Sequence, residues 1–211
     1  MSRTSASRVK VRAGDQIPSI GLRASDGFLL NLRSFVTKQP VAFLFFGAAT
    51  MQGAARRTGH KLADALANGY DRLREAGIAV VGVSCDNEKE QLEYIAEHKL
   101  PFLLFSDERR AAVGALGIPT VSSGDNFNVA APVVVAVDAQ GIVRSVIEKP
   151  SPEAVVEQVM HAFAEPLPAP VAGGSAPVEE APGRDGVVPR GAAKAPDDRP
   201  ASETGQAPAE H

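Results

Sequence analysis

The fold of this chain is decided by one stretch, Val41-Ala42-Phe43-Leu44-Phe45-Phe46-Gly47-Ala48-Ala49-Thr50-Met51-Gln52-Gly53-Ala54-Ala55. Its first six residues are apolar without interruption, which predicts a strand that is buried on both faces. The small residues that follow predict a loop, and a helix is predicted to begin near Gly53. In α/β proteins, ligands and reacting groups gather beyond the carboxyl end of such a central strand. A functional site is therefore expected in the loop between this strand and the helix.

Further apolar runs place this strand in an α/β sheet. Ile78–Val83 is a second apolar strand, and a helix over Gly53–Ala76 separates it from the first, which predicts a right-handed parallel crossover. Val133–Val137 is a third core strand, with Ile142–Ile147 as its hairpin partner. Before the central strand, the sequence predicts a hairpin turning at Ser25-Asp26-Gly27 and a helical turn over Leu32–Phe35. After the second strand, it predicts a helix with Asn87 and Glu90 as capping box and with Leu92 and Ile95 on its buried face. The remaining predicted elements are a strand over Phe102–Phe105, a helix capped by Ser106, a loop over 119–131 and a last helix starting at Pro152.

Composition divides the chain into three parts. Residues 1–12 are predicted to be a flexible lead-in, and residues 13–163 a single folded domain. Residues 164–211 are rich in proline and contain no aromatic residue, so they cannot bury enough apolar surface to fold and are predicted to be a disordered tail. The segment Pro166–Pro170 favours polyproline geometry and could bind a protein partner, although a solubilising tether is the plainer interpretation.

Charge and cysteine content restrict the function. A net charge of −3 predicts no attraction to nucleic acid or to an anionic membrane. The single cysteine, Cys85, excludes an intramolecular disulfide, and His60 has no metal ligand at suitable spacing, so neither a metal nor another cofactor is predicted. The N-terminus has no apolar core and no run is long enough to span a membrane, so we expect a cytoplasmic protein.

Several framework residues identify a family resemblance. Together with Ala13-Gly14-Asp15, Pro18, Asp26-Gly27, Leu32 and Phe35, the central stretch resembles the peroxiredoxins, the alkyl hydroperoxide reductase and thiol-specific antioxidant family. The resemblance implies a thioredoxin-like α/β fold: a central mixed sheet flanked by helices, with an N-terminal β-hairpin. It also implies a homodimer and an activity, the reduction of hydroperoxides by a cysteine thiolate.

The reactive residues of that family are absent at the matching positions. The resemblance implies a proline, a threonine, a cysteine and an arginine, and without a gap these fall on Gly47, Met51, Ala54 and Pro132. A shift by one residue places Thr50 under the threonine but Gly53 under the cysteine, so neither alignment supplies a sulfur atom. Because alanine cannot form the thiolate that attacks the peroxide, we predict that the reaction is lost at its usual site.

Pro132 has a second implication. Thioredoxins carry a proline preceded by a cis peptide bond at this place, so the resemblance implies a cis bond between Ala131 and Pro132. The alternative is an ordinary trans proline that starts a strand.

Three functions remain open. The first is a peroxidase-inactive protein that works by binding. The second is a thiol oxidoreductase or redox sensor that uses Cys85, whose pKa the following helix N-terminus could lower; the alternative is a small residue that fills space. The third is an anion-binding module at the vacated loop, formed by Thr50, Gly53, Arg56 and Arg57; the alternative is a pair of solvated arginines.

Overall fold

The computed structural model describes residues 9–49, 52–123 and 126–166. The predicted lead-in up to Arg8, the tail from Leu167 onward with most of the Pro166–Pro170 segment, and the predicted site residues Thr50 and Met51 lie outside the described residues.

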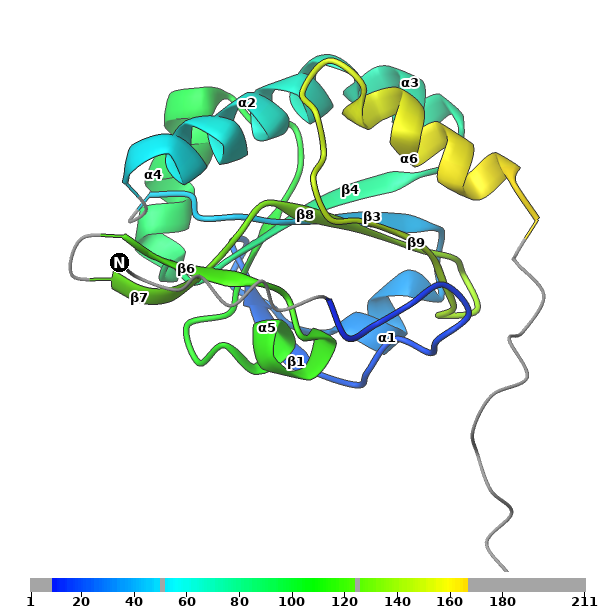
Figure 1. Ribbon diagram of the computed structural model, residues 1–211, viewed down its shortest axis with the longest axis horizontal. Coiled ribbons are helices and arrows are strands. Elements are labelled where there is room, and N and C mark those ends of the chain that lie inside the picture. Colours follow the sequence, from blue (N-terminus) through cyan, green and yellow to red (C-terminus); the bar gives the residue numbers. More distant parts are fainter. Residues whose placement is uncertain (1–8, 50–51, 124–125, 167–211) are drawn as a thin grey trace, which may run out of the picture. The chain divides into compact units, whose positions relative to one another are not determined.

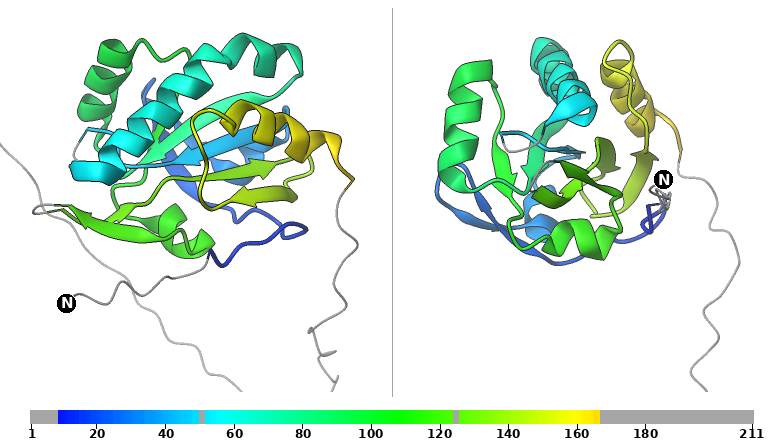
Figure 2. Two further views of the ribbon diagram at one scale, coloured as in Figure 1. Left: turned by 45° about the horizontal axis from the view of Figure 1, so that its top comes forward. Right: turned by 60° about the vertical axis from the view of Figure 1, so that its left-hand side comes forward.

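The core of the described chain is a mixed sheet with helices on both faces (Figures 1 and 2), as predicted. The seven strands of this sheet are ordered β2-β1-β5-β4-β3-β8-β9. Strands β3 and β4 are parallel, as are β4 and β5, whereas β8 is antiparallel to β3. The strands are β1 (Gly21–Ala24), β2 (Leu29–Asn31), β3 (Val41–Phe45), β4 (Ala79–Ser84), β5 (Leu104–Ser106), β8 (Val133–Val137) and β9 (Val143–Ile147).

Two hydrophobic clusters fill the space between the sheet and its helices. Strand β3 is fully buried, and its side chains alternate: Phe43 and Phe45 enter one cluster, whereas Leu44 enters the other. This burial on both faces confirms the prediction from the apolar run. The first cluster is covered by α1 (Leu32–Val36) and α5 (Ala111–Leu116), and the second by α2 (Gly53–Asn68), α3 (Tyr70–Glu75), α4 (Glu88–His98) and α6 (Val155–Ala164).

The predicted helix over Gly53–Ala76 is interrupted at Gly69, which separates α2 from α3. A Cβ atom on Gly69 would lie 2.5 Å from Cγ2 of Val156 in α6, so only glycine permits this close approach. Gly59, the other candidate break, stays inside α2 and packs against Phe46. Close packing therefore explains both glycines, although only one of them ends a helix.

The capping box of α4 is confirmed, whereas the predicted buried face holds only for Ile95, which is half-buried against the second cluster, and not for Leu92. Asn87 accepts a hydrogen bond from the Glu90 backbone, and the Glu90 carboxylate accepts one from the Asn87 backbone. The buried residues are Gln91 and Tyr94, whereas Leu92 is 52% exposed. The Gln91 amide nitrogen donates to the Ser84 hydroxyl over 2.9 Å, and this pairing allows a polar residue to occupy the core position.

Two further helix starts differ from prediction. Helix α5 begins at Ala111 and is capped by the Asp107 carboxylate, which accepts from the backbone of Val113 over 2.8 Å, rather than by Ser106. The Ser106 hydroxyl donates instead to the Asp86 carbonyl. Helix α6 begins at Val155, because the residues from Ser151 to Ala154 form a turn before it.

Two regions predicted to lack regular structure are ordered. Residues 119–131 contain the antiparallel hairpin of β6 (Thr120–Ser123) and β7 (Asn126–Ala130), where a loop was predicted. Val9 and Val11 are buried, and the Val11 backbone donates to the Leu116 carbonyl, so the fold begins before the predicted boundary at residue 13. The predicted strand over Phe102–Phe105 is displaced and becomes β5.

Candidate functional site

The sheet register brings several of the predicted site residues together where the central strands end. Phe45 pairs with Val83 of β4 and with Val133 of β8. The residues just beyond these pairs therefore lie at the same end of the strands; they include Gly47, Cys85 and Pro132. This is the carboxyl end of the central strand β3, where a functional site was expected.

The loop after β3 is held by its backbone. The Ala48 amide donates to Oδ2 of Asp86 over 3.2 Å, and Asp86 is 1% exposed. The Ala48 carbonyl oxygen lies 3.1 Å from Nε2 of His60 in α2. Both polar groups of this residue are therefore engaged, one by the β4–α4 junction and one by α2.

His60 stands between a hydrogen-bond donor and an acceptor, although sequence reasoning gave it no role. Its Nε2 lies 3.1 Å from the Ala48 carbonyl and 3.3 Å from Nε of Arg56, which donates. One nitrogen cannot donate to the first and accept from the second at the same time, so the two contacts favour different protonation states. Burial lowers the pKa of His60, and the charges of His98 and Arg56 lower it further against the opposing effect of the Ala48 carbonyl.

Aromatic rings of α4 lie against His60. The Tyr94 ring is stacked on His98 at 4.2 Å between centroids and meets His60 edge-on at 4.9 Å. Tyr94 is buried, its hydroxyl has no hydrogen-bond partner among the described residues, and burial together with the charge of Asp64 raises its pKa. This ring cluster joins α2 to α4 beside the loop after β3. The histidines of α2 and α4 were the only signal in the sequence that could have identified it.

The positions predicted to replace the reactive cysteine lie at the start of α2. Gly53 is the first helical residue and has a φ of 75°, and Ala54 follows it as an exposed residue. Arg56 is half-buried, whereas Arg57 is exposed. The structure thus brings Gly53, Ala54 and Arg56 next to the held loop, while Arg57 faces solvent.

The thiol of Cys85 is half-buried beside the first hydrophobic cluster. Burial raises its pKa and the charge of Asp107 adds to the rise, against the opposing hydrogen bond from the Ala130 backbone. The predicted lowering of this pKa by a helix N-terminus is therefore wrong. Helix α4 begins only at Glu88, and its capping box already uses the N–H groups at that end.

Pro132 is half-buried directly before β8. The preceding Ala131 donates its amide to the Pro119 carbonyl over 2.8 Å, which fixes the entry into the strand. The cis bond at Ala131–Pro132 stays a prediction.

Neither a membrane span nor a metal site occurs in residues 9–49, 52–123 and 126–166. No helix there is both long and apolar enough to cross a bilayer. No three histidine, cysteine, aspartate or glutamate side chains there are grouped so that they could hold a metal ion.

Comparisons with known proteins agree with this arrangement. The model of the "AhpC/TSA family" matches residues 13–146. The chain is 32% identical over 110 residues to "Peroxiredoxin Q, chloroplastic" of Oryza sativa subsp. japonica, which covers 52% of this chain and 48% of the relative. The protein of the same name from Populus jackii is 33% identical over 110 residues, covering 52% and 49%. The chain thus spans about half the length of the curated relatives it matches.

Solved structures share the fold. "Peroxidoxin BcpB from Mycobacterium tuberculosis" superposes with a TM-score of 0.63 at 19% identity, over 73% of this chain and 97% of that one. A mutant of PrxQ from Xylella fastidiosa gives a TM-score of 0.63 at 16% identity, over 75% and 100% of the two chains. These likenesses confirm the predicted thioredoxin-like fold.

The same relatives contradict the predicted cytoplasmic location, because both are named as chloroplastic proteins. The sequence argument considered only apolar segments. Plastid transit peptides are amphipathic and rich in serine and arginine, so the lack of an apolar run does not test for them.

Proposed function

Because this chain belongs to the AhpC/TSA family, we propose that it is a peroxiredoxin-like protein that acts by binding and has lost the family's thiol peroxidase reaction. The observation that carries this proposal is the state of its only thiol. Cys85 is half-buried and its pKa is raised, whereas peroxide reduction needs a thiolate at working pH.

The start of α2 supports the same proposal. A thiolate there would attack one peroxide oxygen, the S–O bond would form as the O–O bond breaks, and the leaving oxygen would take a proton. Ala54 and Gly53 carry no group that can begin this reaction. Ala48 nevertheless remains anchored to Asp86 and His60, so the framework of the loop persists without the reactive atom.

The proposal is tested by hydrogen peroxide consumption with dithiothreitol as reductant, measured for the wild-type protein and for Cys85→Ser. We expect both proteins to give the rate of dithiothreitol alone. A fast rate that Cys85→Ser abolishes would overturn the proposal and establish the redox role of Cys85 that remains as an alternative. A fast rate that survives the substitution would refute both.

Anion binding at the start of α2 is a second candidate. Helix α2 has 16 residues, and Gln52 at its N-cap makes no side-chain capping bond within the part of the chain that the structure describes, so the first N–H groups and the helix dipole favour an anion. Arg56 and Arg57 lie within the first turns. Equilibrium dialysis with inorganic phosphate tests this, with Lys61→Ala as control; affinity that Arg56→Ala weakens would support it, and no affinity would remove it.

The predicted homodimer and the predicted partner of the tail are likewise proposals. Sedimentation equilibrium over a range of protein concentrations tests the first, and a monomer throughout would reject it. Removal of residues 167–211 tests the second: a partner that binds the full-length protein but not the shortened one would support a binding role for the tail.

A further inference from the structure

The ring cluster between α2 and α4 joins two histidines to an arginine. The rings of His60 and His98 meet edge-on with their centroids 4.8 Å apart, and His98 stacks on Tyr94. Helices α2 and α4 lie next to each other on one face of the sheet (Figures 1 and 2). Arg56 reaches His60 from one turn earlier in α2. The cluster therefore brings together three side chains that can each carry a positive charge.

The Nε2 atom of His60 has two competing partners. Nε of Arg56, at 3.3 Å, can only donate a hydrogen bond, and the Ala48 carbonyl oxygen, at 3.1 Å, can only accept one. In a neutral ring with its hydrogen on Nδ1, Nε2 accepts from Arg56. When the ring takes up a proton from solvent, Nε2 becomes a donor to Ala48, and the contact with Arg56 becomes a contact between two cations. Protonation thus exchanges one partner of this atom for the other.

The two cations beside His60 are held to different degrees. Nδ1 of His98 lies 3.2 Å from Oδ1 of Asp64, and its ring is stacked on Tyr94, so His98 is held from two sides. Among the described residues, the Arg56 side chain forms one hydrogen bond, which is the bond to His60. Arg56 is therefore the side chain that is expected to move when His60 becomes charged.

The surroundings of His60 favour its neutral form at neutral pH. Burial lowers the pKa of His60, and the charges of His98 and Arg56 lower it further. The Ala48 carbonyl and the Asp64 carboxylate oppose this lowering. The exchange of partners is therefore expected in mild acid. The other titratable side chains beside the cluster are Asp86, Tyr94 and Glu97.

We propose that His60 is an acid-operated switch: protonation transfers Nε2 from Arg56 to the Ala48 carbonyl and releases the Arg56 guanidinium to solvent. In acid, a charge-assisted hydrogen bond then holds the loop after β3 to α2, and the guanidinium groups of Arg56 and Arg57 both face solvent. At neutral pH, Arg56 stays against the ring. The proposal rests neither on the loss of the peroxidase reaction nor on anion binding, because it concerns contacts within the chain.

The position of the ring proton is the first test. Two-bond proton–nitrogen correlation spectra of the full-length protein, labelled with nitrogen-15 histidine, distinguish a protonated ring nitrogen from an unprotonated one. At about pH 8, we expect Nδ1 of His60 to carry the proton, and acid to add a second proton at Nε2. His161, whose side chain is 72% exposed, provides the reference ring. A neutral His60 with its proton on Nε2 would overturn the proposal, because that atom would already donate to Ala48.

Hydrogen exchange at the Arg56 side chain is the second test, with the exposed Arg57 as internal reference. At neutral pH, the Nε–H group of Arg56 should exchange about fivefold more slowly than that of Arg57, the factor for a hydrogen bond worth about 1 kcal/mol. The ratio of the two rates should approach one with the midpoint of the His60 titration. A ratio that does not change with pH would overturn the proposal.

Variants assign the switch to His60. In His60→Gln, the ratio of exchange rates should be independent of pH, whereas the matched control His161→Gln should behave as the wild-type protein does. His98→Gln should keep the switch and raise its midpoint, because the charge of His98 opposes protonation of His60. A pH dependence that persists in His60→Gln, or one that disappears in His98→Gln, would assign the titration to another group and overturn the proposal.

Discussion

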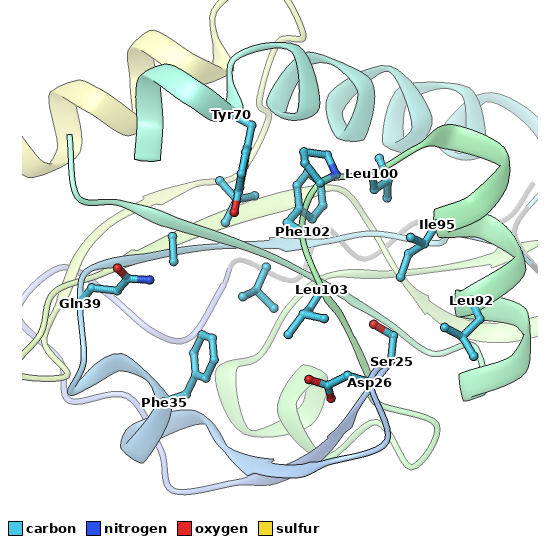
Figure 3. A pocket seen from close by; sticks show the side chains of 14 residues that line it. Ser25, Asp26, Phe35, Gln39, Tyr70, Leu92, Ile95, Leu100, Phe102 and Leu103 are labelled. Carbon is cyan, nitrogen blue, oxygen red and sulfur yellow. The ribbon is translucent and has the colours of Figure 1, made fainter. Parts of the chain in front are cut away.

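At its carboxyl end, β4 leads into Cys85 and Asp86, which neighbouring segments enclose; at its amino end, the same strand lines an apolar groove of about 490 Å³ (Figure 3), although Val80 itself is buried. Asp86 holds the loop after β3 through the Ala48 amide. The end where this family is expected to react is thus tied together by contacts within the chain, while the other end lines a groove of mostly apolar side chains. The chain thus keeps the contacts that hold the loop after β3, although a reactive cysteine is absent from the start of α2.

A large effect at the carboxyl end of β4 is expected from Asp86→Ala, because it leaves the Ala48 amide without this partner. An unpaired buried donor costs about 1–3 kcal/mol, so the free energy of unfolding in urea should fall by about that amount. Asp86→Asn keeps an oxygen that can accept the same bond and should cost less. Equal losses for the two variants would show that the charge, rather than the hydrogen bond, holds this end of β4.

A thiol placed at the start of α2 sharpens the comparison between this position and Cys85. In a Cys85→Ser background, Ala54→Cys should give a thiol with a pKa at least about one unit below that of Cys85, because the helix N-terminus and Arg56 favour the thiolate. The pH dependence of iodoacetamide labelling measures both values. A cysteine at position 54 that titrates as high as Cys85 would mean that Ala54 does not occupy the family's reactive position.

The exposed face of α4, beside the amino end of β4, should tolerate polar substitution. Leu92→Ser is expected to change the free energy of unfolding by no more than about 0.5 kcal/mol, since the side chain is 52% exposed. Tyr94→Ala, on the buried face of the same helix, is the contrasting variant and should cost several times more, on the order of 3 kcal/mol. Comparable losses in the free energy of unfolding would indicate that Leu92 is part of the core, as the apolar pattern of the sequence predicts.

The framework could be predicted from the sequence because continuous apolar runs and capping residues determine it locally. The run from Val41 to Phe46 identified β3, and Asn87 with Glu90 identified the start of α4. The phase of α4 could not be predicted, because burial of Gln91 depends on the Ser84 hydroxyl of another element. The raised pKa of Cys85 could not be predicted for the same reason: its cause is burial among segments distant in sequence.

The ring cluster beside the loop was also not predicted from the sequence, although His60 and His98 belong to it, and the last prediction concerns its titration. The pKa of His60 is lowered in the folded chain, so near pH 6 the unfolded chain binds more protons at this residue than the folded one. The stabilisation it provides is therefore complete above about pH 6.5 and is lost as the pH falls through the folded pKa. Arg56, Asp64 and His98 also carry charges near the ring, and they remain in the control variant His60→Gln, whose amide can still donate to Ala48.

Urea midpoints measured from pH 7.5 to pH 5.5 should consequently fall further for the wild-type protein than for His60→Gln. A steeper fall in the variant would mean that protonated His60 stabilises the fold through Ala48. In that case the bond to the carbonyl, and not the contact with Arg56, would be the interaction that holds α2 to the loop.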